Sequence, residues 1–317
     1  MYQQRYLITG GSGFIGTALV KSLLLDDQQV TVLSRDMVKT ARHFSQIMGK
    51  HPNKVSVISD LDRLNPEINF DVVINLAGQG IADKRWTDKI KQELIDSRIN
   101  TTRALCDYLK ESLLKPDVFI SASALGYYGL GKNTDSDSPD ATLDESAKPD
   151  QSFSSQLCQA WENEAKCIEK LGIRSCYLRT GIVLGKDGGA LGKMLPAFKW
   201  GLGGPMGHGK QWMSWIHRDD LIGIIYFLVE NEKISGAVNG TAPNPVSNKE
   251  FSRVLGKVLK RPAFLPMPAF LLKIMLGEMA EELLLSGRRV IPKKVQQAGY
   301  TFKYTELEKA LRDILRS

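Results

Sequence analysis

The sequence predicts an α/β protein: a Rossmann-type, doubly wound parallel sheet with a smaller, mainly helical C-terminal substrate domain. Short apolar runs rich in β-branched residues alternate with longer amphipathic stretches through the first half of the chain. A glycine-rich turn joins the first run to the first amphipathic stretch. Beyond Thr180, glycine and proline become frequent, and helical periodicity dominates from Lys249 onward. We therefore expect a Rossmann domain over residues 1–180 and a substrate domain over residues 181–317, with an approximate boundary across which segments can interleave.

Each predicted strand is a short apolar run bounded by turn residues. The runs are Tyr6–Thr9, Val30–Leu33, Val55–Ile58, Val72–Leu76, Val118–Ser121 and Ser175–Leu178. Between them, apolar residues recur at helical spacing in Gly13–Leu25, Asp88–Leu113 and Ser155–Leu171. Parallel strands need long crossover connections, so this alternation predicts a mostly parallel sheet with helices on both faces. The polar stretch Gly131–Pro149 is predicted to be an exposed loop.

The charge and apolar content indicate which partners to expect. The 317 residues include 42 Lys and Arg against 35 Asp and Glu, a net charge of +7. The basic residues are scattered, and no zinc-finger or RNA-binding aromatic signature is present, so the excess suits a phosphorylated cofactor better than a nucleic acid. The longest apolar run, Leu221–Val229, is far shorter than the roughly 20 residues that cross a bilayer. We expect a small-molecule substrate and neither a nucleic-acid nor a membrane partner; the oligomeric state stays open.

The cysteines indicate a reducing compartment. Cys106, Cys158, Cys167 and Cys176 form no Cys-x-x-Cys pair and have no histidine at metal-ligand spacing. Neither a disulfide framework nor a zinc site is therefore expected. The first predicted strand begins within a few residues of Met1, which leaves no room for a signal peptide. These features predict a cytoplasmic protein.

Residues 7–20, LITGGSGFIGTALV, carry the strongest functional motif. Gly11-Ser12-Gly13-Phe14-Ile15-Gly16 matches Gly-x-Gly-x-x-Gly, with Gly10 ahead of it, between a predicted strand and a predicted helix. Glycines let the backbone turn sharply and approach a pyrophosphate without an intervening Cβ atom. The N–H groups of the first helical turn then face the anion, which the helix dipole stabilises by roughly 0.3–1 kcal/mol. The motif predicts a dinucleotide site; a tight turn that only packs a helix on a strand is the alternative.

The end of the second predicted strand, VTVLSRD, indicates which dinucleotide binds. In proteins selective for NAD, an acidic residue at this place binds the ribose 2′-hydroxyl. In this chain Ser34 and Arg35 occupy the turn, and a hydroxyl beside a guanidinium suits the 2′-phosphate of NADP(H) through charge-assisted hydrogen bonds. Asp36 is a competing ribose-binding acid, but it also suits the N-cap of the helix that starts MVKTARHF. We expect NADP(H).

Further motifs extend the glycine turn into a family resemblance. DVVINLAGQ at residues 71–79 resembles the fourth-strand Asn-x-Ala-Gly element of short-chain dehydrogenase/reductases, and WIHRDDL at residues 215–221 resembles a segment of their extended members. The segments IADKRW, ISASALGYYG, LRTGIVLGKDGGALGKMLPAFKWGLGGPMGHGKQWMSWIHRDD and GEMAEELLLSGRRVIPKKVQQAGYTFKY resemble an atypical "epimerase family" branch, called SulA-like in some genomes. The likeness covers nearly the whole chain. It implies a Rossmann fold that binds NADP(H), without an established substrate.

The expected cofactor-binding residues come from the glycine turn, the end of the second strand and the fourth-strand element, whose backbone lines the adenine and ribose path in the family that the chain resembles. Lys84 and Arg85, just after the fourth-strand turn, could reach the cofactor or an anionic substrate; solvated surface positions are the alternative. The predicted set is Gly10, Ser12, Gly13, Phe14, Ile15, Gly16, Ser34, Arg35, Leu76, Ala77, Gly78, Gln79 and Arg85.

The resemblance also implies catalytic positions, and there the sequence departs from the family pattern. Short-chain dehydrogenases use a Ser and a Tyr-x-x-x-Lys pair, in which the Tyr moves a proton and the Lys lowers the pKa of that Tyr. Ser123 matches the Ser, but the Tyr and Lys positions fall on Ser154 and Cys158. General acid–base help of this kind is worth about 10²–10⁴ in rate. Tyr127 and Tyr128 are the nearest replacement proton donors, with simple packing of their rings as the alternative.

No metal is expected in this protein. His217, Asp219 and Asp220 lie close together, but no further ligands cluster nearby, and Asp219 or Asp220 suits the N-cap of a helix that begins at Leu221. The sequence thus predicts an NADP-dependent oxidoreductase or epimerase that acts on an unknown small metabolite. Because the Tyr-x-x-x-Lys pair is missing, a non-catalytic NADP(H)-binding regulatory or partner protein is the alternative.

Overall fold

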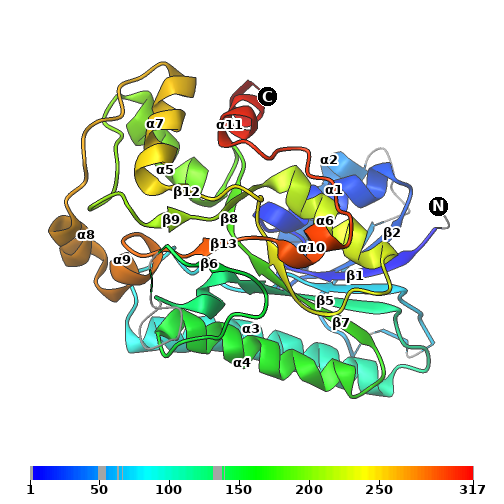
Figure 1. Cartoon of the computed structure of the whole chain (residues 1–317). Coiled ribbons are helices and arrows are strands. Elements are labelled where there is room, and N and C mark those ends of the chain that lie inside the picture. Colours follow the sequence, from blue (N-terminus) through cyan, green and yellow to red (C-terminus); the bar gives the residue numbers. More distant parts are fainter. Residues whose placement is uncertain are drawn as a thin grey trace.

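A computed structural model describes residues 3–48, 55–62, 64–65, 67–130, 138 and 140–316, and it confirms the predicted fold class (Figure 1). The centre is a parallel seven-stranded sheet in the order β11-β7-β5-β4-β1-β2-β3. Its strands are β1 (Arg5–Thr9), β2 (Gln29–Leu33), β3 (Val55–Ile58), β4 (Val72–Asn75), β5 (Val118–Ala124), β7 (Arg174–Thr180) and β11 (Gly236–Gly240). The strand order reverses at β1, between β2 and β4. In such sheets ligands bind beside this reversal, at the carboxyl ends of the strands.

Helices cover both faces of the sheet. The helices in chain order, including those of the C-terminal part, are α1 (Phe14–Leu25), α2 (Met37–Met48), α3 (Asp88–Glu111), α4 (Phe153–Glu169), α5 (Gly189–Lys199), α6 (Arg218–Glu230), α7 (Asn248–Leu259), α8 (Ala269–Leu276), α9 (Glu278–Leu283), α10 (Lys293–Gln297) and α11 (Leu307–Arg316). α3 and α4 run side by side below the sheet in Figure 1. Leu7 and Phe119 pack with α3 and α4, whereas Ile8 and Ile120 pack with α1 and α6. Burial on both faces explains why the strands are nearly continuous apolar runs.

The six predicted strands all form, and the sheet gains a seventh from beyond residue 180. This strand, β11, has the sequence GAVNG, whose two glycines carry little strand propensity. It pairs with β7 in parallel register, with Val238 opposite Leu178. The chain therefore leaves the sheet after β7, forms two helices over residues 189–199 and 218–230, and returns to the sheet at β11 before the remaining helices.

The C-terminal part has its own core and is mainly helical, as predicted. Leu195 and Phe198 of α5, Phe251 and Leu255 of α7, and Leu311 of α11 are buried together in it. Short strand pairs lie outside the central sheet. They join β8 (Ile182–Leu184) with β10 (Trp215–His217), β9 (Trp212–Met213) with β12 (Val246–Ser247), and β6 (Thr142–Leu143) with β13 (Arg289–Val290).

The prediction that the cysteines form no disulfide is wrong. Cys106 of α3 and Cys167 of α4 are bonded, with their Cα atoms 6.3 Å apart and a sequence separation of 61. The packing of α3 against α4 brings the two cysteines together, and this contact cannot be predicted from their spacing in the sequence. Cys158 and Cys176 are free and buried.

The predicted exposed loop Gly131–Pro149 lies partly outside the described residues, and its described part is tied to the C-terminal region. Lys293 Nζ lies 2.6 Å from Asp144 Oδ2. Hydrogen bonds to the Asp144 carboxylate lower its pKa from 3.8 to about 2, with the largest effect from Lys293 and a smaller one from Ser146. A carboxyl whose pKa is lower in the folded than in the unfolded protein stabilises the fold above about pH 4, and this contribution disappears as the pH falls toward 2.

We expect Asp144→Asn to reduce the free energy of unfolding at pH 7 by less than about 1 kcal/mol, because solvent screens this pair. Urea denaturation at pH 7 and at about pH 3 measures the effect. The gap between variant and wild type should narrow at the lower pH, because the Asp144 carboxyl is then protonated in the unfolded wild-type chain while it stays mostly ionised in the folded protein. Lys293→Met is the matched control and should cause the same loss at pH 7 without adding to it in the double variant. A gap that stays constant with pH would contradict this account.

Candidate nucleotide site and buried polar network

The glycine turn forms a cradle that has no room for a Cβ atom at Gly10 or Gly16. Gly10 has a φ of +67°, and a Cβ atom there would lie 2.5 Å from the carbonyl oxygen of Leu76. A Cβ atom on Gly16 would lie 2.2 Å from the carbonyl oxygen of Gly10. Gly13 is the N-cap of α1 and offers no side-chain acceptor to the first N–H groups of the helix. These features fit a pyrophosphate, which needs close backbone approach and free helical N–H groups.

A cavity of about 940 Å³ lies beside this cradle, at the carboxyl ends of β1, β2 and β4 and against α3. Its volume is within the range of about 300–1,000 Å³ typical of ligand sites. Nine of the thirteen predicted cofactor residues line it: Gly10, Ser12, Gly13, Ser34, Arg35, Leu76, Ala77, Gly78 and Gln79. The sequence missed the α3 contribution to the lining, Glu93, Asp96, Ser97, Asn100 and Thr101, because an amphipathic pattern does not show which polar residues face a ligand.

The other four predicted residues lie outside the cavity lining. Ile15 packs against the core, and Gly16 is buried beneath the turn. Phe14 packs against the glycines of residues 185–189, with the Arg218 guanidinium 4.8 Å from its ring centre. Arg85 lies beside Gly277, at the loop between α8 and α9.

The end of β2 presents positive charge to the cavity. Asp36 Oδ1 accepts a hydrogen bond of 2.9 Å from Lys39 N, which confirms Asp36 as the N-cap of α2. Arg35, Lys39 and His43 all line the cavity. Only Arg35 was predicted from the sequence. The three residues are spaced four apart, and this spacing places side chains on one face of a helix, so it could have indicated Lys39 and His43 as well. One oxygen of the Asp36 carboxylate is thus engaged with the helix, and the basic residues Arg35 and Lys39 line the same cavity.

A buried arginine holds the turn after β4 in place. Arg98 of α3 donates from Nη2 to the carbonyl oxygen of Gln79 at 3.0 Å and from Nη1 to that of Leu94 at 2.9 Å. A Cβ atom on Gly78 would lie 3.2 Å from its guanidinium carbon, so the glycine permits this contact. Burial lowers the pKa of Arg98 below its ordinary value. Sequence reasoning missed this residue because an arginine in an amphipathic helix is ordinarily solvated.

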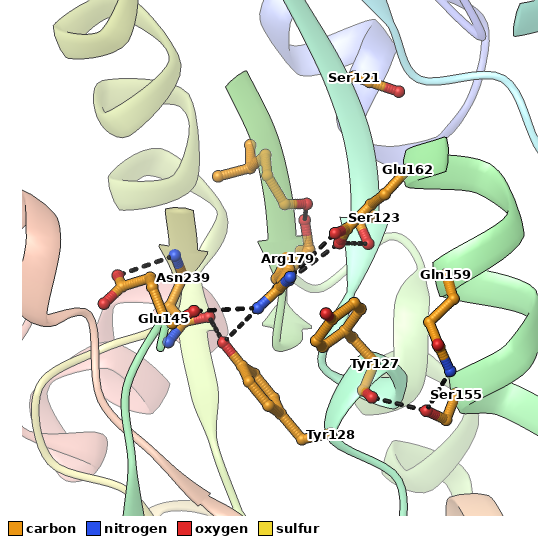
Figure 2. A network of polar contacts seen from close by, with 12 residues as sticks. Ser121, Ser123, Tyr127, Tyr128, Glu145, Ser155, Gln159, Glu162, Arg179 and Asn239 are labelled. Atoms are coloured by element: carbon orange, nitrogen blue, oxygen red, sulfur yellow. Dashed lines mark hydrogen bonds and ion pairs between the residues drawn. The ribbon is translucent and has the colours of Figure 1, made fainter. Parts of the chain in front are cut away.

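Ser123 joins a buried ion pair at the carboxyl end of β5 (Figure 2). Its Oγ donates to Glu162 Oε1 at 2.7 Å. Arg179 of β7 forms a fork with Glu162, from Nε to Oε1 and from Nη2 to Oε2, both at 2.9 Å. All three side chains are buried. Burial disfavours the charge on Arg179, but the hydrogen bonds with Glu162 and Tyr128 raise its pKa overall. A bidentate Arg–carboxylate pair of this kind fixes the Ser123 hydroxyl in one orientation.

The two predicted tyrosines both lie against Arg179 and differ in their environments (Figure 2). Tyr128 is fully buried, and its hydroxyl donates to Asn239 Oδ1 at 2.7 Å and accepts from Arg179 Nη1 at 3.0 Å. Burial raises the pKa of Tyr128 to about 12 despite the opposing effect of Arg179. Tyr127 is partly exposed, and the Arg179 guanidinium lies 3.3 Å from its ring centre.

Ser154 and Cys158, which stand where the family has its Tyr and Lys, do not replace those residues. Ser154 Oγ donates to Glu282 Oε2 at 2.6 Å, and the backbone N–H groups of Phe153 and Ser154 donate to the same carboxylate. Glu282 of α9 therefore caps the N-terminus of α4 from outside the helix. Burial raises the pKa of Cys158 to about 11, so its thiol is neutral at physiological pH. Neither position supplies the cation that would assist a tyrosine.

The prediction that Asp219 or Asp220 is the N-cap of the helix after His217 is wrong. α6 begins at Arg218, and His217 is its N-cap, with Nδ1 accepting from Asp219 N at 3.0 Å. The Asp220 carboxylate accepts instead from Lys303 N and Tyr304 N. Among the residues that the structure describes, no cluster of three or more His, Cys, Asp or Glu side chains is suited to a metal.

The parallel sheet, the glycine cradle and the Ser at the end of β5 define an extended short-chain dehydrogenase/reductase fold. Residues 6–239 match the model of the NAD dependent epimerase/dehydratase family, and the chain belongs to that family. Residues 267–314 match a domain of unknown function, DUF1731.

Relatives extend the match over almost the full chain. The chain is 39% identical to the chloroplastic epimerase family protein SDR39U1 homolog of Arabidopsis thaliana, over 99% of this chain and 87% of that protein. It is also 39% identical to the epimerase family protein YfhF of Bacillus subtilis, over 97% of each. Among solved structures, the human epimerase family protein SDR39U1 with NADPH superposes with a TM-score of 0.84 at 32% identity, covering 98% of this chain and 99% of that one.

Proposed function

We propose that this protein binds NADP(H) in the cavity beside the glycine turn. The observation that carries the proposal is the combination of a turn in which Gly10 and Gly16 leave no room for a Cβ atom with basic residues at the end of β2. The cradle suits the pyrophosphate, and Arg35, with Lys39 and His43 nearby, suits a 2′-phosphate. Asp36 also lines the cavity, but its Oδ1 already accepts from Lys39 N as the N-cap of α2. The human relative that was crystallised with NADPH supports the same assignment.

Arg35→Glu should weaken NADP(H) binding by roughly tenfold to a hundredfold, because a hydrogen bond to a charged group is worth about 1.5–3 kcal/mol. Binding of NAD(H) should change far less, since it has no 2′-phosphate. Calorimetric titration of both nucleotides measures the ratio of the two affinities. Arg42→Glu makes the same charge change on an exposed residue of α2 outside the cavity lining and is the matched control. Unchanged NADP(H) affinity in Arg35→Glu would refute the role of this residue.

We propose that the reaction is an oxidoreduction or epimerisation of a small metabolite. When bound, a nicotinamide nucleotide accepts or supplies a hydride. Ser123 would orient a substrate oxygen. Because its proton is already donated to Glu162, its oxygen is available to accept a hydrogen bond, and it therefore suits a substrate hydroxyl better than a carbonyl.

Of the two tyrosines, we propose Tyr127 as the proton donor. The hydroxyl of Tyr128 is committed to Asn239 and Arg179 inside the core, so Tyr128 serves to position Arg179. Tyr127 is partly exposed and lies against the Arg179 guanidinium, which can stabilise negative charge developing on the ring.

The rival function is a non-catalytic NADP(H) sensor, since the Tyr-x-x-x-Lys pair is absent. The two are separated by incubating the NADPH-loaded protein with fractionated metabolite pools and following absorbance of the reduced nicotinamide. Consumption that the wild type supports and Ser123→Ala does not would favour the enzyme. NADPH that stays intact with every pool, together with a macromolecular partner that binds in one redox state only, would favour the sensor.

A further inference from the structure

Two segments of the C-terminal part, residues 199–210 and 260–276, lie side by side along the left edge of the molecule in Figure 1. Backbone hydrogen bonds join them from Leu265 N to Gly203 O at 3.3 Å and from Gly207 N to Met267 O at 2.8 Å. The Arg261 side chain also donates from Nε to the carbonyl oxygen of Lys199 at 3.1 Å. The two segments therefore form one continuous surface that ends in α8.

This surface exposes an unusual amount of apolar area. Of the fifteen large apolar side chains that are exposed in the described part of the chain, nine belong to it. Trp200 is 82% exposed, Phe264 73%, and Phe270 and Ile274 67% each. We call the nine residues the apolar edge: Trp200, Leu202, Phe264, Leu265, Met267, Phe270, Leu271, Ile274 and Met275. Contiguous exposed apolar patches on folded proteins mark interaction sites.

The composition of α8 accounts for much of this exposed apolar surface. Its residues AFLLKIML contain a single charged side chain, and only Leu272 is buried. By contrast, α11 buries Leu307, Leu311 and Ile314 and exposes charged residues on its other face, as a surface helix normally does. An apolar face turned to solvent along α8 requires a partner that accepts apolar groups.

The two stretches of chain that form the apolar edge carry only basic charges, although Glu281 of the neighbouring α9 pairs with Lys273 of α8. The stretches 188–218 and 251–277 contain basic residues and no Asp or Glu. Lys199, Lys260 and Arg261 are exposed next to Trp200, and none of them forms an ion pair with an acidic side chain in the described ranges. A partner for this surface must therefore combine apolar groups with negative charge.

We propose that the apolar edge docks the protein onto a bilayer surface that contains anionic phospholipids. Trp200, Phe264 and Phe270 would enter the interface between headgroups and acyl chains, where aromatic side chains are favoured. Lys199, Lys260 and Arg261 would contact lipid phosphates, each basic residue contributing about 1 kcal/mol near an anionic leaflet. None of the helices in the described ranges is long and apolar enough to cross a membrane, so the contact is peripheral.

A second copy of the chain fits this surface less well. A two-fold dimer apposes the same patch on both subunits, so it would bring the unpaired basic side chains toward one another. Like charges facing each other at an interface are repulsive. Docking at the apolar edge does not depend on NADP(H) binding. The sequence predicts no membrane partner because it has no segment long enough to span a bilayer, whereas peripheral docking needs no such segment.

Co-sedimentation of the full-length protein with vesicles tests the proposal. Wild type should bind phosphatidylcholine–phosphatidylserine vesicles at least about tenfold more tightly than pure phosphatidylcholine vesicles, with binding reduced by salt. The combined variant Trp200→Ser, Phe264→Ser and Phe270→Ser should lose at least about tenfold in binding to the anionic vesicles. These side chains are exposed, so its thermal unfolding midpoint should match that of the wild type.

A matched control separates the surface from general hydrophobicity. Leu25, Val38 and Leu113 are 65%, 66% and 70% exposed but lie on other elements, and replacing all three by Ser should leave vesicle binding unchanged. The proposal would be overturned if the wild-type protein did not bind anionic vesicles. It would also be overturned if the two triple variants lost vesicle binding to the same extent. A dimer detected by analytical ultracentrifugation and abolished only by the Trp200/Phe264/Phe270 variant, without vesicle binding, would assign the surface to a second copy.

Discussion

Replacing Gly16 by Ala should weaken binding of nicotinamide nucleotides by more than about a hundredfold, a loss of more than about 2.7 kcal/mol. The added Cβ atom would lie 2.2 Å from Gly10 O and 2.7 Å from Gly11 Cα, both backbone atoms of the same turn. The turn would have to open, and the N–H groups at the start of α1 would then no longer converge on a pyrophosphate. Isothermal titration of NADPH and NADP⁺ into the folded variant measures the loss.

The matched control is Gly192→Ala. Gly192 lies within α5, and the nearest atom to a Cβ atom there is Lys186 O at 3.8 Å, an ordinary contact. Nucleotide affinity should be unchanged, and stability should stay the same or rise by up to about 1 kcal/mol, since Ala is favoured over Gly inside a helix. A Gly16→Ala protein that folds and binds NADPH as tightly as Gly192→Ala would mean that the turn does not hold the nucleotide.

Glu162→Leu should lower the free energy of unfolding by about 3–5 kcal/mol, because it leaves the buried Arg179 guanidinium without its carboxylate. Arg179 and Glu162 have side chains only 5% and 8% exposed, so solvent cannot replace the lost partner. Ser123 also loses the acceptor of its hydroxyl. Chemical denaturation followed by circular dichroism gives the change.

A double-mutant cycle distinguishes the pair from a general packing defect. Glu162→Leu with Arg179→Leu should be more stable than Glu162→Leu alone, because no unpaired charge is then buried. Arg253→Leu breaks an exposed pair with Glu250 on α7 and should lower the free energy of unfolding far less than Glu162→Leu does. Equal, small losses in Glu162→Leu and Arg253→Leu would show that the Glu162–Arg179 pair does not support the core.

The features that could be predicted from the sequence depend on residues close together in the chain. The glycine turn needs only Gly10 to Gly16 between a strand and a helix, and Asp36 caps α2 three residues before its partner, Lys39. Strand positions followed because burial on both faces requires continuous apolar runs. Backbone sterics, capping and periodicity act over a few residues, so the local sequence contains the information.

Tertiary structure alone decided the contacts between distant residues. Ser123 and Glu162 are 39 residues apart, and Tyr128 and Asn239 are 111 apart, yet each pair is joined by one hydrogen bond. The Cys106–Cys167 bond and the strand β11 arise in the same way. The apolar edge, too, exists only because two separate segments align. Such contacts depend on how helices and strands pack after the chain has closed long loops, and neither residue spacing nor periodicity records which distant side chains that packing brings together.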